Sequence, residues 1–191
     1  MFVLGIDPGL SRCGYGCVET GAKARGGTAV AAGVLRTPPD MPLPERLAAL
    51  DADLRALLAD LKPDAVAVER LFFQTNARTA MAVGQASGLV LAAAARTGCE
   101  VAQYTPNEVK QAVAGYGAAP KEQVTRMVQS LLGLPAPPRP ADAADALALA
   151  LCHIAMAPLR AKVARAIGFR QAAPENGGNL PKTGCGPVAA R

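Results

Sequence analysis

The sequence has little of what zinc sites, disulfide frameworks and secreted proteins are built from. Its 191 residues include one histidine, His153, and five cysteines that form no CxxC pair. An odd number of unclustered cysteines is typical of reduced thiols, so we expect neither a zinc site nor a disulfide-bonded fold. The N-terminus does not resemble a secretory signal peptide, and a cytoplasmic location is expected.

Long apolar segments are also missing. The most apolar one, residues 80–95, is sixteen residues long, contains Gln85 and Ser87, and is followed by Arg96. A membrane-spanning helix needs about 20 apolar residues, so this segment predicts a helix buried in a globular core. No membrane is implied.

Acidic residues are scarce towards the C-terminus. Residues 158–191 carry six basic side chains and one acidic one, whereas residues 1–157 carry fourteen of each. From residue 168 the composition predicts a basic, disordered tail, so we expect a folded domain at 1–167 and a tail at 168–191. If four acids of the domain bound metal, its remaining surface would be basic and would suit a phosphate backbone; a solvated tail without a target fits the charge equally well.

The order of the predicted elements indicates an α/β fold, with a mixed sheet and helices on its faces. Short apolar segments bounded by turn signals predict strands at 2–6, 14–20, 29–37, 64–69 and 100–104. Leucines spaced four and three apart predict a helix at 42–62, and further apolar patterns predict helices at about 77–97, from 106, at 121–132 and from 141.

Four acids interrupt apolar segments. Asp7 and Glu69 end two predicted strands, and if these strands are parallel neighbours, both side chains emerge at one edge of the sheet. Asp142 and Asp145 share a face of the last helix that continues with apolar residues, which places them on its buried side. Helix capping is the alternative; it suits Asp142 but does not explain Asp145.

Clustered carboxylates repel one another, by roughly 4 kcal/mol for a pair about 4 Å apart at an effective dielectric near 20. Divalent cations relieve this repulsion, and oxygen ligands without His or Cys indicate Mg²⁺ or Mn²⁺. Two such ions hydrolyse phosphodiesters without a histidine base. His153, inside an apolar helix, is therefore interpreted as a core residue.

Four motifs, taken in order, carry a family resemblance: LGIDPGLSRCGYG (4–16), VAVERLFF (66–73), GQASG (84–88) and ADAADALALA (141–150). Together they resemble the RuvC Holliday-junction resolvases over residues 1 to about 160. The resemblance implies a ribonuclease H-like fold with a mixed five-stranded sheet flanked by helices. It also implies a metal-dependent endodeoxyribonuclease that resolves four-way DNA junctions by paired symmetric nicks, in recombination and repair.

The resemblance places the family's metal-binding acids on Asp7, Glu69, Asp142 and Asp145, with Mg²⁺ or Mn²⁺, two ions per site, as the cofactor. Some members have His at the position of Asp142.

Other site residues follow from the same motifs. The resemblance assigns Phe72 to stacking in the opened junction centre, while Phe73 either stacks on DNA or packs in the core. Lys110 and Lys121 match family lysines near the DNA and the active site. Cys13 replaces the Thr that the family commonly has there.

The family is dimeric, and its implied partners are four-way junction DNA and a branch-migration helicase complex. Gly84 and Gly88, in GxxxG spacing, give the helix at 77–97 a face that permits close approach, although internal packing would also explain them. A symmetric homodimer presents two sites to two related strands.

Other functions fit parts of the pattern. A ribonuclease H-like nuclease could act on RNA instead. An actin-like or sugar-kinase-like ATPase would need two such domains, and the sequence has neither GxxxxGK[ST] nor GxGxxG. A non-catalytic junction-binding protein would have no physical reason to keep four buried like charges.

Overall fold

The computed structural model describes residues 1–21, 26–70 and 77–167. The chain divides into two compact units, Met1–Pro158 and Leu159–Arg191, and the fold described below is that of the first. Phe72 and Phe73 lie outside the described residues, as does the segment 168–191 that the sequence predicts as a tail.

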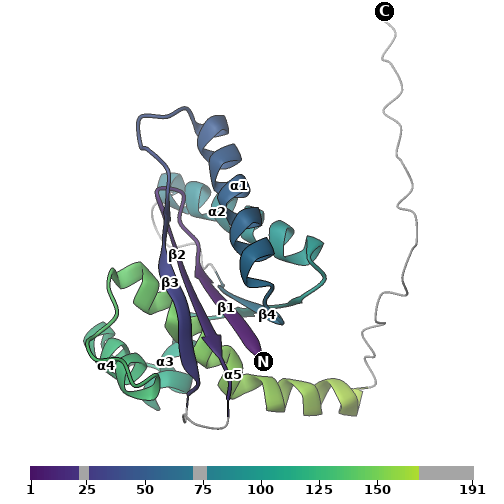
Figure 1. Ribbon diagram of the computed structural model, residues 1–191, viewed down its shortest axis with the longest axis vertical. Helices are drawn as coiled ribbons and strands as arrows, with labels where there is room; N and C mark the ends of the chain where they lie inside the picture. The colour runs from purple at the N-terminus through teal and green to yellow at the C-terminus, as the bar shows by residue number, and fades with distance from the viewer. Residues whose placement is uncertain (22–25, 71–76, 168–191) are drawn as a thin grey trace, which may run out of the picture. The chain divides into compact units, whose positions relative to one another are not determined.

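The first unit contains a mixed five-stranded sheet in the order β3-β2-β1-β4-β5 (Figure 1). The first three strands form an antiparallel meander, while β1, β4 and β5 run parallel. The strands are β1 (Phe2–Asp7), β2 (Arg12–Glu19), β3 (Thr28–Arg36), β4 (Ala65–Glu69) and β5 (Glu100–Tyr104).

Helices cover both faces of the sheet because each interior strand is apolar on both sides. On one face, side chains of the central strands pack with α1 and α2; on the other they pack with α3, α4 and the first part of α5. The helices are α1 (Leu43–Leu61), α2 (Ala77–Arg96), α3 (Pro106–Ala114), α4 (Lys121–Leu131) and α5 (Ala141–Ile167). The predicted α/β fold and mixed sheet are confirmed, and each predicted strand or helix is present with its ends shifted by no more than two residues.

Three glycines bring α5 into direct contact with the sheet. Gly5 of β1 pairs with Gly16 of β2, and Gly14 stands opposite Asp7. A Cβ atom on Gly5 would overlap a backbone carbonyl of α5, and one on Gly14 would overlap the carbonyl oxygen of Asp142. The helix therefore lies on a flat glycine surface, closer than side chains would allow.

Within the described part of the chain, the segment Ala141–Val163 of α5 has the length and apolarity of a membrane-spanning helix. Most of its residues between 143 and 152 are buried against the sheet and the neighbouring helices. The buried part has the environment of a core helix, whereas residues 154–163 are half-buried or exposed. Among the described residues this segment, and not residues 80–95, comes nearest to a membrane-spanning helix in length and apolarity.

Candidate active site

Asp7 and Glu69 are the last residues of β1 and β4. These strands are parallel neighbours, with Ile6 opposite Val68, so both acids leave the sheet at the same edge, as predicted. Side chains alternate along a strand, and Asp7 therefore lies on the same face as Gly5, the face that α5 covers. The apolar strand segments fix the position of the two carboxylates.

A cavity of about 470 Å³ opens at this edge. Its charged lining consists of Asp7, Glu69, Asp145, Lys110 and Lys121, with apolar side chains of α3, α4, α5 and the loop between α3 and α4 forming the remainder. The structure thus brings together three of the four predicted acids and both predicted lysines.

Burial and crowding of like charges dominate the electrostatics of the cavity. The pKa of Asp7 is raised to about 7, first by burial and then by repulsion from Glu69, Asp145 and Asp142, while Lys121 opposes the rise. Burial and Asp145 also raise the pKa of Glu69, against a hydrogen bond from Asp7. The site therefore holds more negative charge than its own cations neutralise.

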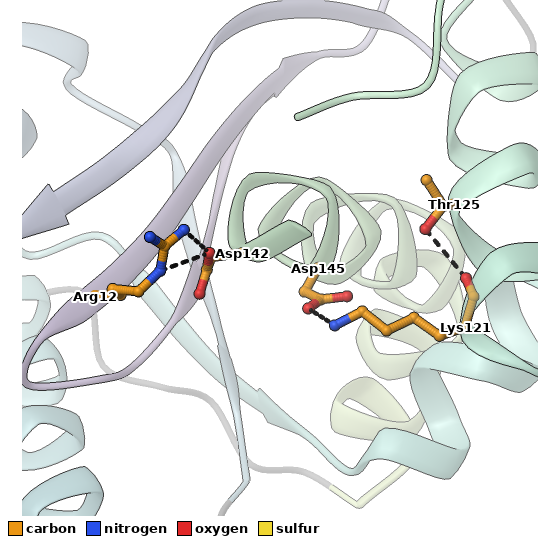
Figure 2. A network of polar contacts seen from close by, with 5 residues as sticks. All are labelled: Arg12, Lys121, Thr125, Asp142 and Asp145. Atoms are coloured by element: carbon orange, nitrogen blue, oxygen red, sulfur yellow. Dashed lines mark hydrogen bonds and ion pairs between the residues drawn. The ribbon is translucent and has the colours of Figure 1, made fainter. Parts of the chain in front are cut away.

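Lys121 neutralises part of this charge. Its Nζ donates a hydrogen bond to Oδ2 of Asp145 over 2.6 Å, and this bond is the main reason why the pKa of Lys121 is raised (Figure 2). Lys121 is the first residue of α4, an end of a helix that disfavours a cation. The hydrogen bond with Asp145 accounts for the position of Lys121 at that end of the helix.

Lys110 is held by the start of α3. Thr105 and Glu108 form a capping box, in which the Thr105 hydroxyl accepts a hydrogen bond from the Glu108 backbone and the Glu108 carboxylate accepts one from Thr105. Such a cap fixes the first turn of a helix, and Lys110 is one turn further on. Val109, beside it, is buried and anchors the helix to the core.

Asp142 has a different environment. It does not line the cavity but forms an ion pair with Arg12, the first residue of β2, whose Nη2 and Nε both donate to Oδ2 of Asp142 over 2.5 and 3.1 Å (Figure 2). The hydrogen bond from Arg12 lowers the pKa of Asp142. Helix α5 begins at Ala141, so Asp142 lies in its first turn. Sequence reasoning missed Arg12, and no local signal identifies a partner 130 residues away.

The donor set was tested for its fit to a divalent metal. Among the side chains that the structure describes, no three His, Cys, Asp or Glu form a ready-made metal cluster. The ion pairs account for this, because Arg12 and Lys121 draw the carboxylates of Asp142 and Asp145 in different directions (Figure 2). By chemistry the residues fit a hard cation: all donors are carboxylate oxygens, and burial together with the charge of the neighbouring acids raises the pKa of Asp7 to about 7.

The remaining candidates are structural. His153 is fully buried, and its Nδ1 lies 3.0 Å from the hydroxyl of Tyr104, which confirms it as a core residue. Cys13 is buried as well, and burial raises the pKa of its thiol to about 12, so it is not a nucleophile.

Known proteins are similar to this chain in sequence and in fold. The family model described as crossover junction endodeoxyribonuclease RuvC matches residues 3–153. The chain belongs to the RuvC family. The RuvC of Moorella thermoacetica is 56% identical over 160 residues, which cover 84% of this chain and 95% of that protein. The family predicted from four motifs is confirmed, and with it a nuclease.

Two solved structures of the RuvC family have the same fold. The structure of Thermus thermophilus RuvC matches with a TM-score of 0.78 and 42% identity, over 84% of this chain and 97% of that one. T. thermophilus RuvC in complex with a Holliday junction substrate matches with a TM-score of 0.75 and 40% identity, over 83% and 96% of the two chains.

Proposed function

We propose that this RuvC-family chain is an endonuclease that resolves four-way DNA junctions in recombination and repair, as a cytoplasmic homodimer that makes paired, symmetric nicks. One observation carries the chemistry: carboxylates from the ends of two parallel strands and from α5 meet two lysines in a single open cavity. The junction as substrate is supported by the related T. thermophilus protein, whose structure contains a Holliday junction substrate.

Asp7, Glu69, Asp142 and Asp145 would hold the divalent cations, Mg²⁺ or Mn²⁺ and two per site. When bound, these ions supply an activated water and stabilise the leaving oxygen of the phosphodiester. Burial raises the pKa of Asp7 first, and the negative charge of Glu69, Asp145 and Asp142 adds to the rise; such cations would neutralise this charge.

The lysines act on the protein side of the reaction. Lys121 fixes the orientation of Asp145 through its 2.6 Å hydrogen bond and reduces the repulsion that Asp7 experiences. Lys110 lines the same cavity and attracts the phosphate backbone. Phe72 and Phe73 keep the role given by the sequence alone, with Phe72 stacking on bases of the opened junction.

The homodimer is proposed to form through α2. Apart from the adjacent residues and the nearby backbone of α2 itself, no described atom lies within 4 Å of where a Cβ of Gly84 or Gly88 would stand, so packing against other described elements does not explain these glycines. Met81, one turn before Gly84, is 67% exposed, which is unusual for a large apolar side chain. The proposed nuclease domain covers 1–167, with 168–191 as a basic tail, and the branch-migration helicase complex is the proposed partner.

The test is a mobile four-way junction incubated with Mg²⁺ and Mn²⁺ separately, with nicks mapped on all four strands. Paired nicks on opposing strands are expected, and a matched RNA hairpin should remain intact. Random cuts, or cleavage of the hairpin alone, would contradict the proposal.

Asp7→Asn is the matching variant for the site. It should lose cleavage, by at least a hundredfold, because an amide cannot replace a carboxylate ligand, and it should still bind the junction in a gel-shift assay. Normal cleavage by this variant with either metal would show that the reaction takes place elsewhere.

A further inference from the structure

The ion pair between Arg12 and Asp142 lies outside the cavity lining but near Asp7, because the Asp142 backbone lies against Gly14, which stands opposite Asp7 in the sheet. Two nitrogen atoms of the Arg12 guanidinium, Nε and Nη2, donate to one oxygen, Oδ2 of Asp142. The geometry of these two hydrogen bonds, and not only the charge, therefore orients the Arg12 side chain. Both side chains reach solvent, with 42% of Arg12 and 25% of Asp142 exposed. A ligand arriving from outside can therefore compete for either partner.

A second network of hydrogen bonds fixes the residues just before Arg12, in the turn between β1 and β2. Arg46 of α1 donates from Nη2 to the Ser11 hydroxyl over 2.5 Å and from Nε to the Thr37 hydroxyl over 3.0 Å. Thr37 is buried and donates to the carbonyl oxygen of Leu10 over 2.6 Å. The backbone just before Arg12 is thus fixed from two sides, and its guanidinium is presented to Asp142 from a rigid base.

The opposite side of Asp142 is fixed equally well. Its carbonyl oxygen lies against Gly14, which pairs with Asp7 in the sheet, so the backbone of Asp142 stands beside the strand end that carries Asp7. The Asp142 carboxylate is close enough to Asp7 to raise the pKa of Asp7 by repulsion, so a cation near Asp7 would compete with Arg12 for Asp142.

We propose that Arg12 is a positioning residue that forms an ion pair with Asp142 in the DNA-free protein and binds a DNA phosphate instead when DNA arrives. Binding of DNA and binding of divalent metal then reinforce each other. The inference rests on the proposed function, which brings a phosphate to this site. A guanidinium fork fits a phosphate as well as it fits a carboxylate. When Arg12 binds the phosphate, Asp142 is free to bind metal. By linkage, DNA and metal each raise the affinity of the protein for the other by the same factor.

Calorimetric titration of the DNA-free protein with Mn²⁺ tests the first half. Arg12→Gln should bind Mn²⁺ about three- to tenfold more tightly than the wild type, because Asp142 no longer has a competing partner. Arg55→Gln is the matched control: it removes one positive charge and the ion pair with Asp51 on α1, and its Mn²⁺ affinity should be that of the wild type. Unchanged or weaker Mn²⁺ binding by Arg12→Gln would overturn the proposal.

Fluorescence anisotropy of a labelled four-way junction, with and without Ca²⁺, tests the coupling. Ca²⁺ binds oxygen sites and probes the same carboxylates. In the wild type Ca²⁺ should tighten junction binding several-fold; in Arg12→Gln binding without metal should weaken and the gain from Ca²⁺ should shrink at least threefold. An equal gain in both proteins would overturn the exchange.

The two proposals fail separately. If the wild type does not nick junctions, the proposed function fails, whereas the Mn²⁺ titration still measures whether Arg12 competes for Asp142. If junctions are resolved normally and Arg12→Gln changes neither Mn²⁺ affinity nor coupling, only the role of Arg12 is lost.

Discussion

The carboxyl group of Asp7 ends a strand whose preceding four residues are fully buried, and it faces two further acids across the cavity. Its pKa of about 7 means that the folded, metal-free protein binds this proton far more tightly than the unfolded chain does. Well below pH 4 the carboxyl of Asp7 is protonated in both the folded and the unfolded state, so it does not change the free energy of unfolding. As the pH rises from 4 to 7, the carboxyl of Asp7 lowers the free energy of unfolding increasingly, by on the order of 4 kcal/mol at most.

Asp7→Asn should therefore stabilise the metal-free protein while destroying its activity. An amide has nearly the same shape and carries no charge, so the cost of burying a carboxylate disappears together with the repulsion from the neighbouring acids. In EDTA the variant should melt several degrees above the wild type at pH 8, and the difference should become small near pH 4.5. Thermal melts at both values measure this, with Asp53→Asn, an exposed acid of α1, as control. Equal melting temperatures of variant and wild type at pH 8 would show that Asp7 is not strained by its neighbours.

At the scale of elements, the glycine surface of β1 and β2 determines where the acids of α5 stand. Gly14 and Gly16 lie on one face of β2, and Gly5 faces Gly16 across the ladder. Because the α5 backbone rests directly on these residues, the height of Asp142 and Asp145 above the sheet depends on the absence of three side chains.

Gly14→Ala should disturb the site more than the fold. The new methyl group would meet the carbonyl oxygen of Asp142 and push the first turn of α5 outward, at a cost of about 1–3 kcal/mol for overpacking. Gly16→Ala is the matched control, since its methyl would press on Leu147, 2.7 Å from Cγ, further along the same helix. Both variants should melt lower, but only Gly14→Ala should weaken Mn²⁺ binding, by at least tenfold in a titration. Parallel losses in both would mean that α5 moves as one rigid body.

The elements were largely predictable because their signals are local. Apolar alternation and leucine spacing act over a few residues, and an acid at the end of an apolar segment marks the end of a strand. From the sequence, the parallel pairing of β1 with β4 is only a condition; the structure supplies it, and with it the meeting of Asp7 and Glu69. The contact between Arg12 and Asp142 could not be predicted, because it depends on how β2 and α5 cross.

The same limit applies to glycines. In the sequence Gly84 and Gly88 form a visible GxxxG pair, whereas Gly5, Gly14 and Gly16 are part of an ordinary strand pattern. The structure shows that the second set makes the close helix contact and that the first set has open space beside it. Spacing along one element does not reveal which partner, if any, approaches it.

For the whole molecule, the proposed function raises the question of how the active-site cavity of each chain would produce two related nicks. A two-fold axis solves this, because the same surface of each copy then meets itself. The open face of α2 has the properties of such a surface: Gly88 and Ala92 are exposed one turn apart, and Met81 extends from the same helix. Small residues allow two helices to approach closely, and the methionine supplies apolar area that adapts to a partner.

Gly88→Glu tests this arrangement, because the new side chain has free space in the monomer and would meet its own copy across the axis. Two like charges brought together in an apolar interface should weaken the dimer at least tenfold, as measured by sedimentation. Ala52→Glu, at an exposed position of α1, is the matched control and should remain dimeric.

The monomeric Gly88→Glu variant should keep Mn²⁺ binding, since no described side chain of α2 lines the cavity. On a junction this variant should give unpaired nicks at a reduced rate, because the second active site no longer binds together with the first. If Gly88→Glu remains a dimer and still makes paired nicks, the two-fold axis lies on a surface other than α2.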